Sequence, residues 1–178
     1  MKVAFILYVF LALVAIVAGC SRTRPEEDTS VLNYDEMIFL DAEDLGEGSI
    51  GSSYKRDILP ILAQHVDSPA DVVEELDYEV GSYKVSSQGQ TYLIYSPDMD
   101  MSEGQNWGNA TFALFDIVNR QLQNSSVRFY AINGGNDLSG MFLTEVTYSQ
   151  AIKSLSRKTD WPYLPKPDHP WYGQEHDE

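Results

Sequence analysis

The chain has 178 residues, of which 27 are acidic and 12 are basic, and its formal net charge is −15. A field of this sign repels nucleic acid and anionic lipid head groups, so a nucleic-acid partner is not expected, whereas cationic proteins and divalent ions are attracted. With a single cysteine, Cys20, the chain cannot form an internal disulfide, but roughly 125 patterned residues suffice for one packed core.

The N-terminal segment combines a positive start with an apolar run. Lys2 precedes the run Val3–Ala18, which contains no charge. Two small residues, Ala18 and Gly19, stand at the end of this segment. The run is shorter than the roughly 20 apolar residues that a spanning helix needs. Its composition is typical of a secretory signal peptide, which we place at residues 1–19.

The motif Val17-Ala18-Gly19-Cys20 resembles the lipobox of bacterial lipoproteins, in which the chain is cut just before a cysteine. The resemblance implies that Cys20 becomes the new N-terminus, with a diacylglyceryl group on its sulfur and a third acyl chain, such as palmitate, on its nitrogen. It also implies an anchor in the cell envelope. Ser21, in place of an Asp that would favour the inner membrane, points to the outer membrane facing the periplasm. The alternative is an uncleaved membrane anchor with an incidental cysteine.

Residues 20–53 are expected to form an acidic tether. Between Pro25 and Tyr54 there are nine acidic residues and no Lys or Arg, and the stretch ends in the Gly/Ser-rich residues 46–53. Such composition is typical of a solvated linker. The exception is Met37–Leu40, four consecutive apolar residues that could dock on the domain or pair as an edge strand.

A globular domain is predicted over residues 54–160. Residues 55–66 have apolar positions at helical spacing, and Pro60 either confines the regular helix to the residues that follow it or lies in a first turn. Ser68 and Pro69 are typical of the start of a short helix over 68–78. Residues 78–87 and 91–97, rich in Tyr, Val and Ile and separated by Gln88-Gly89, predict a β-hairpin.

The second half of the domain is also predicted to contain helices and a β-hairpin. Residues 107–126 predict an amphipathic helix, with one apolar stripe through Trp107, Ala110, Leu114, Val118 and Leu122. Residues 127–133 and 140–146 predict a second hairpin around the turn 134–137, and residues 144–158 a last helix. The expected fold is therefore a single α+β domain, with a mainly antiparallel sheet from two β-hairpins packed with about three helices.

Residues 161–178 are dense in proline and aromatic residues. Prolines at 162, 165, 167 and 170 forbid a helix or a central strand, so the segment should be extended. Trp161, Tyr163, Trp171 and Tyr172 favour a strap packed across the domain. The alternative is an exposed peptide ligand, because two PxxP spacings occur.

Motifs for catalysis or metal binding are weak. The histidines are His65, His169 and His176, and His65 is interpreted as a surface residue at a helix end. A Ser/His/Asp site is not excluded, but neither GxSxG nor HEXXH is present. Asp98, Asp100 and Ser102 resemble the start of a calcium loop, yet Glu103 and Asn109 stand where Gly and Glu are needed. No cofactor or metal is therefore expected, with calcium at this loop left open.

Three functions remain compatible with the sequence. The favoured one is a membrane-tethered binding module for a basic protein, acting as an inhibitor of a lytic enzyme or as an immunity protein against a toxin. An envelope assembly or scaffold protein and a carboxylate-based hydrolase are the alternatives. No enzymatic activity is expected under the favoured interpretation. Its candidate partner-binding residues are Asp98, Asp100, Glu103, Tyr130, Asn136 and Asp137.

Overall fold

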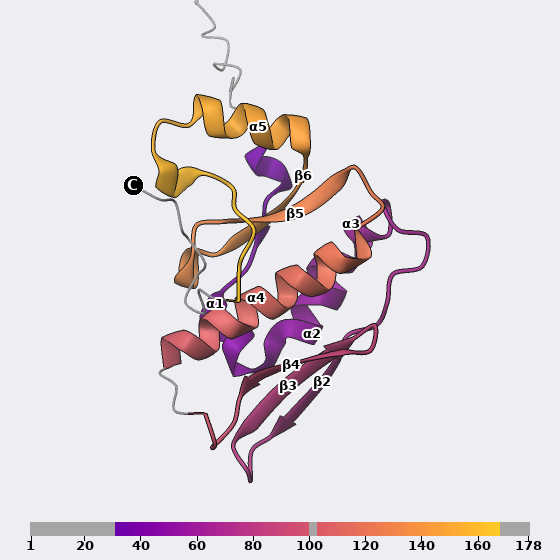
Figure 1. Cartoon of the computed structure of the whole chain (residues 1–178), viewed down its shortest axis with the longest axis vertical. Coiled ribbons are helices and arrows are strands. Elements are labelled where there is room, and N and C mark those ends of the chain that lie inside the picture. Colours follow the sequence, from indigo (N-terminus) through magenta and orange to yellow (C-terminus); the bar gives the residue numbers. More distant parts are fainter. Residues whose placement is uncertain (1–30, 100–102, 168–178) are drawn as a thin grey trace, which may run out of the picture.

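The computed structural model describes residues 31–99 and 103–167, so the expected signal peptide and the lipidation site Cys20 lie outside it. The described residues form a single α+β domain with two separate three-stranded antiparallel sheets (Figure 1). Sheet A has the strand order β1-β6-β5 and sheet B the order β2-β3-β4. The expected fold class is confirmed, but each predicted hairpin lies in its own sheet and gains a third strand there.

Sheet A is built on the second predicted hairpin. Strands β5 (Val127–Ile132) and β6 (Ser139–Thr144) pair from Val127↔Thr144 to Ile132↔Ser139, joined by the turn η4 (Gly135–Asp137). Strand β1 (Ile38–Phe39) adds to the edge of β6. The apolar residues 37–40 thus provide an edge strand, one of the two outcomes that the sequence left open.

Sheet B contains the first predicted hairpin and a strand that the sequence analysis missed. Strands β3 (Ser82–Ser87) and β4 (Gln90–Tyr95) join through Gln88 and Gly89, whose φ angles of 49° and 76° suit a tight hairpin turn. Strand β2 (Val73–Asp77) occupies the place of the predicted helix over 68–78. That helix prediction was wrong, and burial along residues 73–77 alternates with the period of two that is typical of a strand. The Ala70 amide donates to Gln121 Oε1 at 2.7 Å, and this bond holds the start of the segment extended.

The predicted tether is wrong for residues 31–53, which belong to the folded domain. An irregular helical segment runs through α1 (Ala42–Asp44), η2 (Leu45–Ser49), α2 (Ile50–Ser53), η3 (Tyr54–Ile58) and α3 (Leu59–Leu62). The Asp41 carboxylate caps its start by accepting bonds from the amides of Glu43 and Asp44. One side of the segment is buried, namely Ala42, Leu45, Ile50, Tyr54, Ile58 and Leu62. Acidic, Gly and Ser residues between these positions hide this helical spacing in the sequence.

The helix α4 (Glu103–Gln121) crosses the molecule between the two sheets (Figure 1). Its buried residues include the predicted stripe positions Ala110, Leu114 and Val118. These join the main core, which also receives side chains from both sheets and from the segment 42–62. The prediction of this helix is confirmed, because its apolar stripe is wide and uninterrupted.

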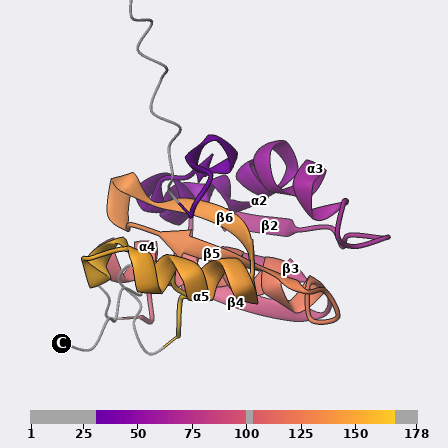
Figure 2. The ribbon, with the colours of Figure 1, turned by 90° about the horizontal axis from the view of Figure 1, so that it is seen from above.

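The helix α5 (Glu145–Ser154) covers the opposite face of sheet A and is also as predicted. Thr144 caps its start by accepting a bond from the Thr147 amide at 3.1 Å. A smaller core of Leu32, Tyr130, Ile132, Met141, Leu143 and Ala151 lies beneath it. Seen from above, α5 and the pair α2 and α3 lie on opposite sides of the β5–β6 hairpin (Figure 2).

The described part of the C-terminal strap packs on the free edge of β5. Tyr163 and Ala131 exchange two backbone hydrogen bonds of 2.8 and 2.9 Å, and the Tyr163 hydroxyl donates to the Asn133 carbonyl at 2.7 Å. Trp161 Nε1 donates to the Leu155 carbonyl at 3.0 Å. Residues 161–163 therefore pack against the domain, whereas residues 168–178 of the predicted strap lie outside the description. Within the described ranges, none of the helices has the length and apolar character needed to cross a bilayer.

Candidate functional site

One end of sheet B gathers exposed aromatic and acidic side chains. The register Tyr83↔Tyr95 places the end of β4 beside the start of β3. The β2–β3 turn and the residues after Tyr95 therefore lie at the same end of the sheet, the lower end in Figure 1. We call this surface the acidic–aromatic end and define it by Glu47, Asp77, Tyr78, Glu79, Val80, Tyr95 and Asp98.

Its aromatic component is a tyrosine presented on a fixed turn. The Asp77 carboxylate accepts bonds from the amides of Glu79 and Val80 at 2.9 and 3.0 Å, which holds the turn. Tyr78 is 85% exposed and Val80 is 57% exposed. A fixed backbone lowers the entropy that a partner must remove when it binds these side chains. The turn therefore offers a preorganised apolar contact.

The acidic component surrounds this turn. Burial raises the pKa of Tyr95 above its ordinary value, and the electrostatic influence of the Tyr78 hydroxyl and of the Glu47 carboxylate raises it further, so both groups lie within electrostatic range of Tyr95. Asp98 is exposed three residues after Tyr95. Neither residues 74–83 nor residues 88–99 contain Lys or Arg. Lys84 between them pairs with Glu75 at 2.8 Å, and the end as a whole keeps a negative potential.

The sequence-predicted residues divide between this end and other places. Asp98 lies at the acidic–aromatic end. Asp100 and the side chain of Glu103 are outside the described part. Asn136 and Asp137 are exposed on η4, where Asn136 Nδ2 donates to Glu43 Oε2 at 3.0 Å. Glu43 belongs to the same helical segment as Glu47 of the acidic–aromatic end.

Tyr130, the remaining candidate partner-binding residue, is not an exposed surface residue. It is only 7% exposed, because α5 covers this face of sheet A and Tyr148 stacks on its ring with centroids 4.6 Å apart. His65 lies exposed after the end of α3 and stacks on Phe142 at 5.6 Å, in agreement with its interpretation as a surface residue at a helix end.

The residues that the sequence analysis missed are Glu47, Tyr78, Val80 and Tyr95. Glu47 was assigned to a tether, and Tyr78 to the junction of a helix and a strand. The sequence signal that could have identified this turn is Asp77, followed four residues later by Gly81. In the structure, Gly81 has a φ angle of 73°, which favours glycine. An Asp and a Gly at this spacing between two β-prone stretches are typical of a tight connection rather than a helix end.

The half-buried carboxylates of sheet B and α4 stabilise packing. Tyr83 donates to Glu74 and Tyr92 donates to Asp116, each at 2.5 Å. Burial, and then the bond to the carboxylate, raises the pKa of both tyrosines well above the usual range. Both hydroxyls therefore stay protonated donors at neutral pH.

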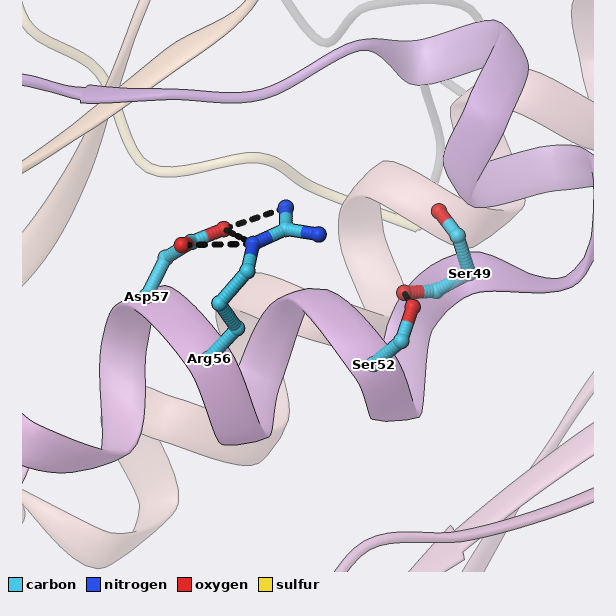
Figure 3. A network of polar contacts seen from close by, with 4 residues as sticks. All are labelled: Ser49, Ser52, Arg56 and Asp57. Carbon is cyan, nitrogen blue, oxygen red and sulfur yellow. Dashed lines mark hydrogen bonds and ion pairs between the residues drawn. The ribbon is translucent and has the colours of Figure 1, made fainter.

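A second group of polar residues lies along the helical residues 49–57 (Figure 3). Ser52 Oγ donates to the Ser49 carbonyl at 2.9 Å, and the Arg56 guanidinium contacts both carboxylate oxygens of Asp57 at 2.6–3.0 Å. This ion pair is exposed on the Arg56 side, with 70% of the side chain accessible, so it adds little to stability. Within residues 31–99 and 103–167, no three His, Cys, Asp or Glu residues come together as metal ligands.

Comparisons with known proteins returned no matching family model, no matching curated protein and no matching solved structure.

Proposed function

We propose that this chain is a lipid-anchored protein of the cell envelope whose folded domain binds a basic protein through the acidic–aromatic end. The anchor is the lipid on Cys20, implied by the motif Val17–Cys20, on a membrane that faces the periplasm. The partner is a toxin or a lytic enzyme, and binding inhibits it. The observation that carries the proposal is Tyr78, 85% exposed on a turn that Asp77 holds in place and that acidic residues surround.

The two components of this surface have different roles in binding. Tyrosine is among the residues that contribute most to binding free energy when a partner buries them. The acidic residues around it steer a cationic partner and raise its association rate, while they repel acidic proteins. Such a division suits an anchored protein that must capture one basic partner among many others.

A photo-cross-linking experiment in the producing cell tests the proposal. A photoreactive amino acid replaces Tyr78 in one variant and Val146, which is 66% exposed on α5, in the matched control. We expect position 78, and not position 146, to form an adduct with a basic protein of the periplasm or of a competing cell. An adduct with an integral envelope component would favour the scaffold alternative instead. Equal adducts at both positions, or none at position 78, would contradict the proposal.

A further inference from the structure

A cavity of about 360 Å³ lies between β5, α5 and the strap. It is lined by Ser126, Arg128, Tyr130, Glu145, Tyr148, Ser149 and Leu164, among others, and we call it the α5 pocket. Arg128 Nη1 donates to the carbonyls of Leu122, Ser125 and Val127, each at 2.8 Å, which fixes the guanidinium. The pocket thus combines a fixed cationic plane with a pair of stacked tyrosine rings.

These walls suit an aromatic side chain. An indole ring is attracted to a guanidinium through the cation–π interaction and packs favourably beside other rings. Arg128 loses little freedom when such a ring binds, because backbone carbonyls already hold it. Leu164, which is 43% exposed, adds apolar surface at this cavity.

We propose that the α5 pocket binds an aromatic residue of an acidic peptide, and that its occupant is Trp171 of this chain's own segment 168–178. The last described residue is Pro167, three residues after Leu164 of the pocket. Trp171 follows four residues later, within a reach of about 13 Å. Because the segment is covalently tethered beside the pocket, its effective concentration is on the order of millimolar, and weak contacts suffice to hold it.

Charge favours this occupant. Residues 145–167 carry the basic Lys153, Arg157, Lys158 and Lys166 against only Glu145 and Asp160, whereas the described residues before them carry 17 acidic and five basic residues. Segment 168–178 contains Asp168, Glu175, Asp177 and Glu178 and no Lys or Arg. The last described stretch of the chain is therefore net basic where this acidic segment begins.

The test compares two soluble chains that begin at Ser21, one ending at Glu178 and one at Pro167. The buried residues of both described cores lie between Leu32 and Tyr163, so the shorter chain keeps them all. We expect backbone amide NMR shifts to differ at Ser126, Tyr148 and Ser149, and a synthetic peptide of residues 168–178 added to the shorter chain to restore them. Trp171→Ala in the peptide should weaken its binding at least tenfold.

Two variants of the shorter chain provide a matched pair. Lys153→Gln, on α5, should weaken peptide binding several-fold, whereas Lys84→Gln, in sheet B, should leave it unchanged. Absence of shift differences between the two chains, or a peptide affinity insensitive to Trp171→Ala, would overturn the proposal. Shift differences that grow with protein concentration would assign the pocket to the tail of a second copy. Vesicle binding by the shorter chain without peptide binding would assign the region to an anionic lipid surface.

Discussion

Tyr83 is buried in the main core and donates to the Glu74 carboxylate at 2.5 Å. Burial is the largest cause of the raised pKa of the Tyr83 hydroxyl, and the hydrogen bond to Glu74 is the second largest. The pKa in the folded state therefore lies above the value of about 10 in the unfolded chain. The folded state binds this proton more tightly, so the stabilisation is complete below pH 10 and is lost as the pH rises through the folded-state value.

We predict that the free energy of unfolding falls with rising pH above about pH 10, and that Tyr83→Phe makes this fall shallower. At pH 7 the same change should destabilise the fold by about 1–3 kcal/mol, because Glu74 loses its donor. Urea unfolding from pH 7 to pH 11 measures both effects. Tyr78→Phe, on an 85% exposed side chain, is the control. An alkaline slope of Tyr83→Phe as steep as that of the wild type would contradict this account.

Gly140 in β6 leaves space for the ring of Phe129, which lies between Phe115 and Phe142 with centroid distances of 4.6 and 4.7 Å. A Cβ atom at position 140 would come within 2.6 Å of Phe129 Cε2. Gly140→Ala should therefore destabilise the fold by about 1–3 kcal/mol through overpacking. Gly104→Ala in α4, where no atom of the described residues would lie within 4 Å of the added Cβ, should be neutral or stabilising. Equal melting temperatures for the two variants would show that the three rings are packed loosely.

Among the elements, those with an uninterrupted local pattern were predictable. The wide stripe of α4 and the two hairpins, one marked by Gln88-Gly89, have strong local signals, and the structure confirms them. Strand β2 was missed because Ser68 and Pro69 imitate a helix start, while the contact between Ala70 and Gln121 that keeps the segment extended joins residues 51 positions apart. Residues 31–53 were missed because their acidic and small residues resemble a linker by composition alone.

Deletion of residues before Tyr54 tests the role of this N-terminal segment. The deletion removes Leu32, Ile38, Leu40, Ala42, Leu45 and Ile50, all of which are at most 8% exposed. The large side chains contribute about 1.5–3 kcal/mol each, a total comparable to the whole stability of a domain. We expect the shortened chain to lose cooperative thermal unfolding by circular dichroism. A chain beginning at Val31 is the control, and a cooperative transition in both chains would restore the tether interpretation.

For the whole molecule, the sequence predicted the net charge but not which residues lie together on the surface. The acidic balance and the loop containing Asp98 were evident, and the structure places Asp98 on an exposed surface. The proximity of Tyr78 and of Glu47 to Tyr95 depends on pairing between strands and on a helical segment distant in sequence, which local patterns do not encode. The burial of Tyr130 likewise depends on α5, which covers this face of sheet A and which the sequence of the strand alone does not reveal.

The membrane anchor is a separate prediction about the whole molecule. Cys20→Ser should leave an unlipidated precursor that a detergent-free wash releases from membranes, because two or more acyl chains are needed for firm anchoring. Incorporation of a labelled fatty acid and fractionation of washed membranes measure this outcome. Retention of the variant at the wild-type level would favour a spanning anchor over a lipid.

The most direct test of the acidic–aromatic end is the association rate with the partner that cross-links at position 78. Stopped-flow measurements compare the wild type, a variant with Glu47→Gln, Glu79→Gln and Asp98→Asn, and a charge-matched control with Asp35→Asn, Asp67→Asn and Glu145→Gln. They are made at about 0.01 M and about 1 M salt, where the screening length is roughly 30 and 3 Å. We predict that salt slows association of the wild type and of the control, and that the first variant associates slowly at both concentrations. Equal rates for the first variant and the control at low salt would contradict the proposed surface.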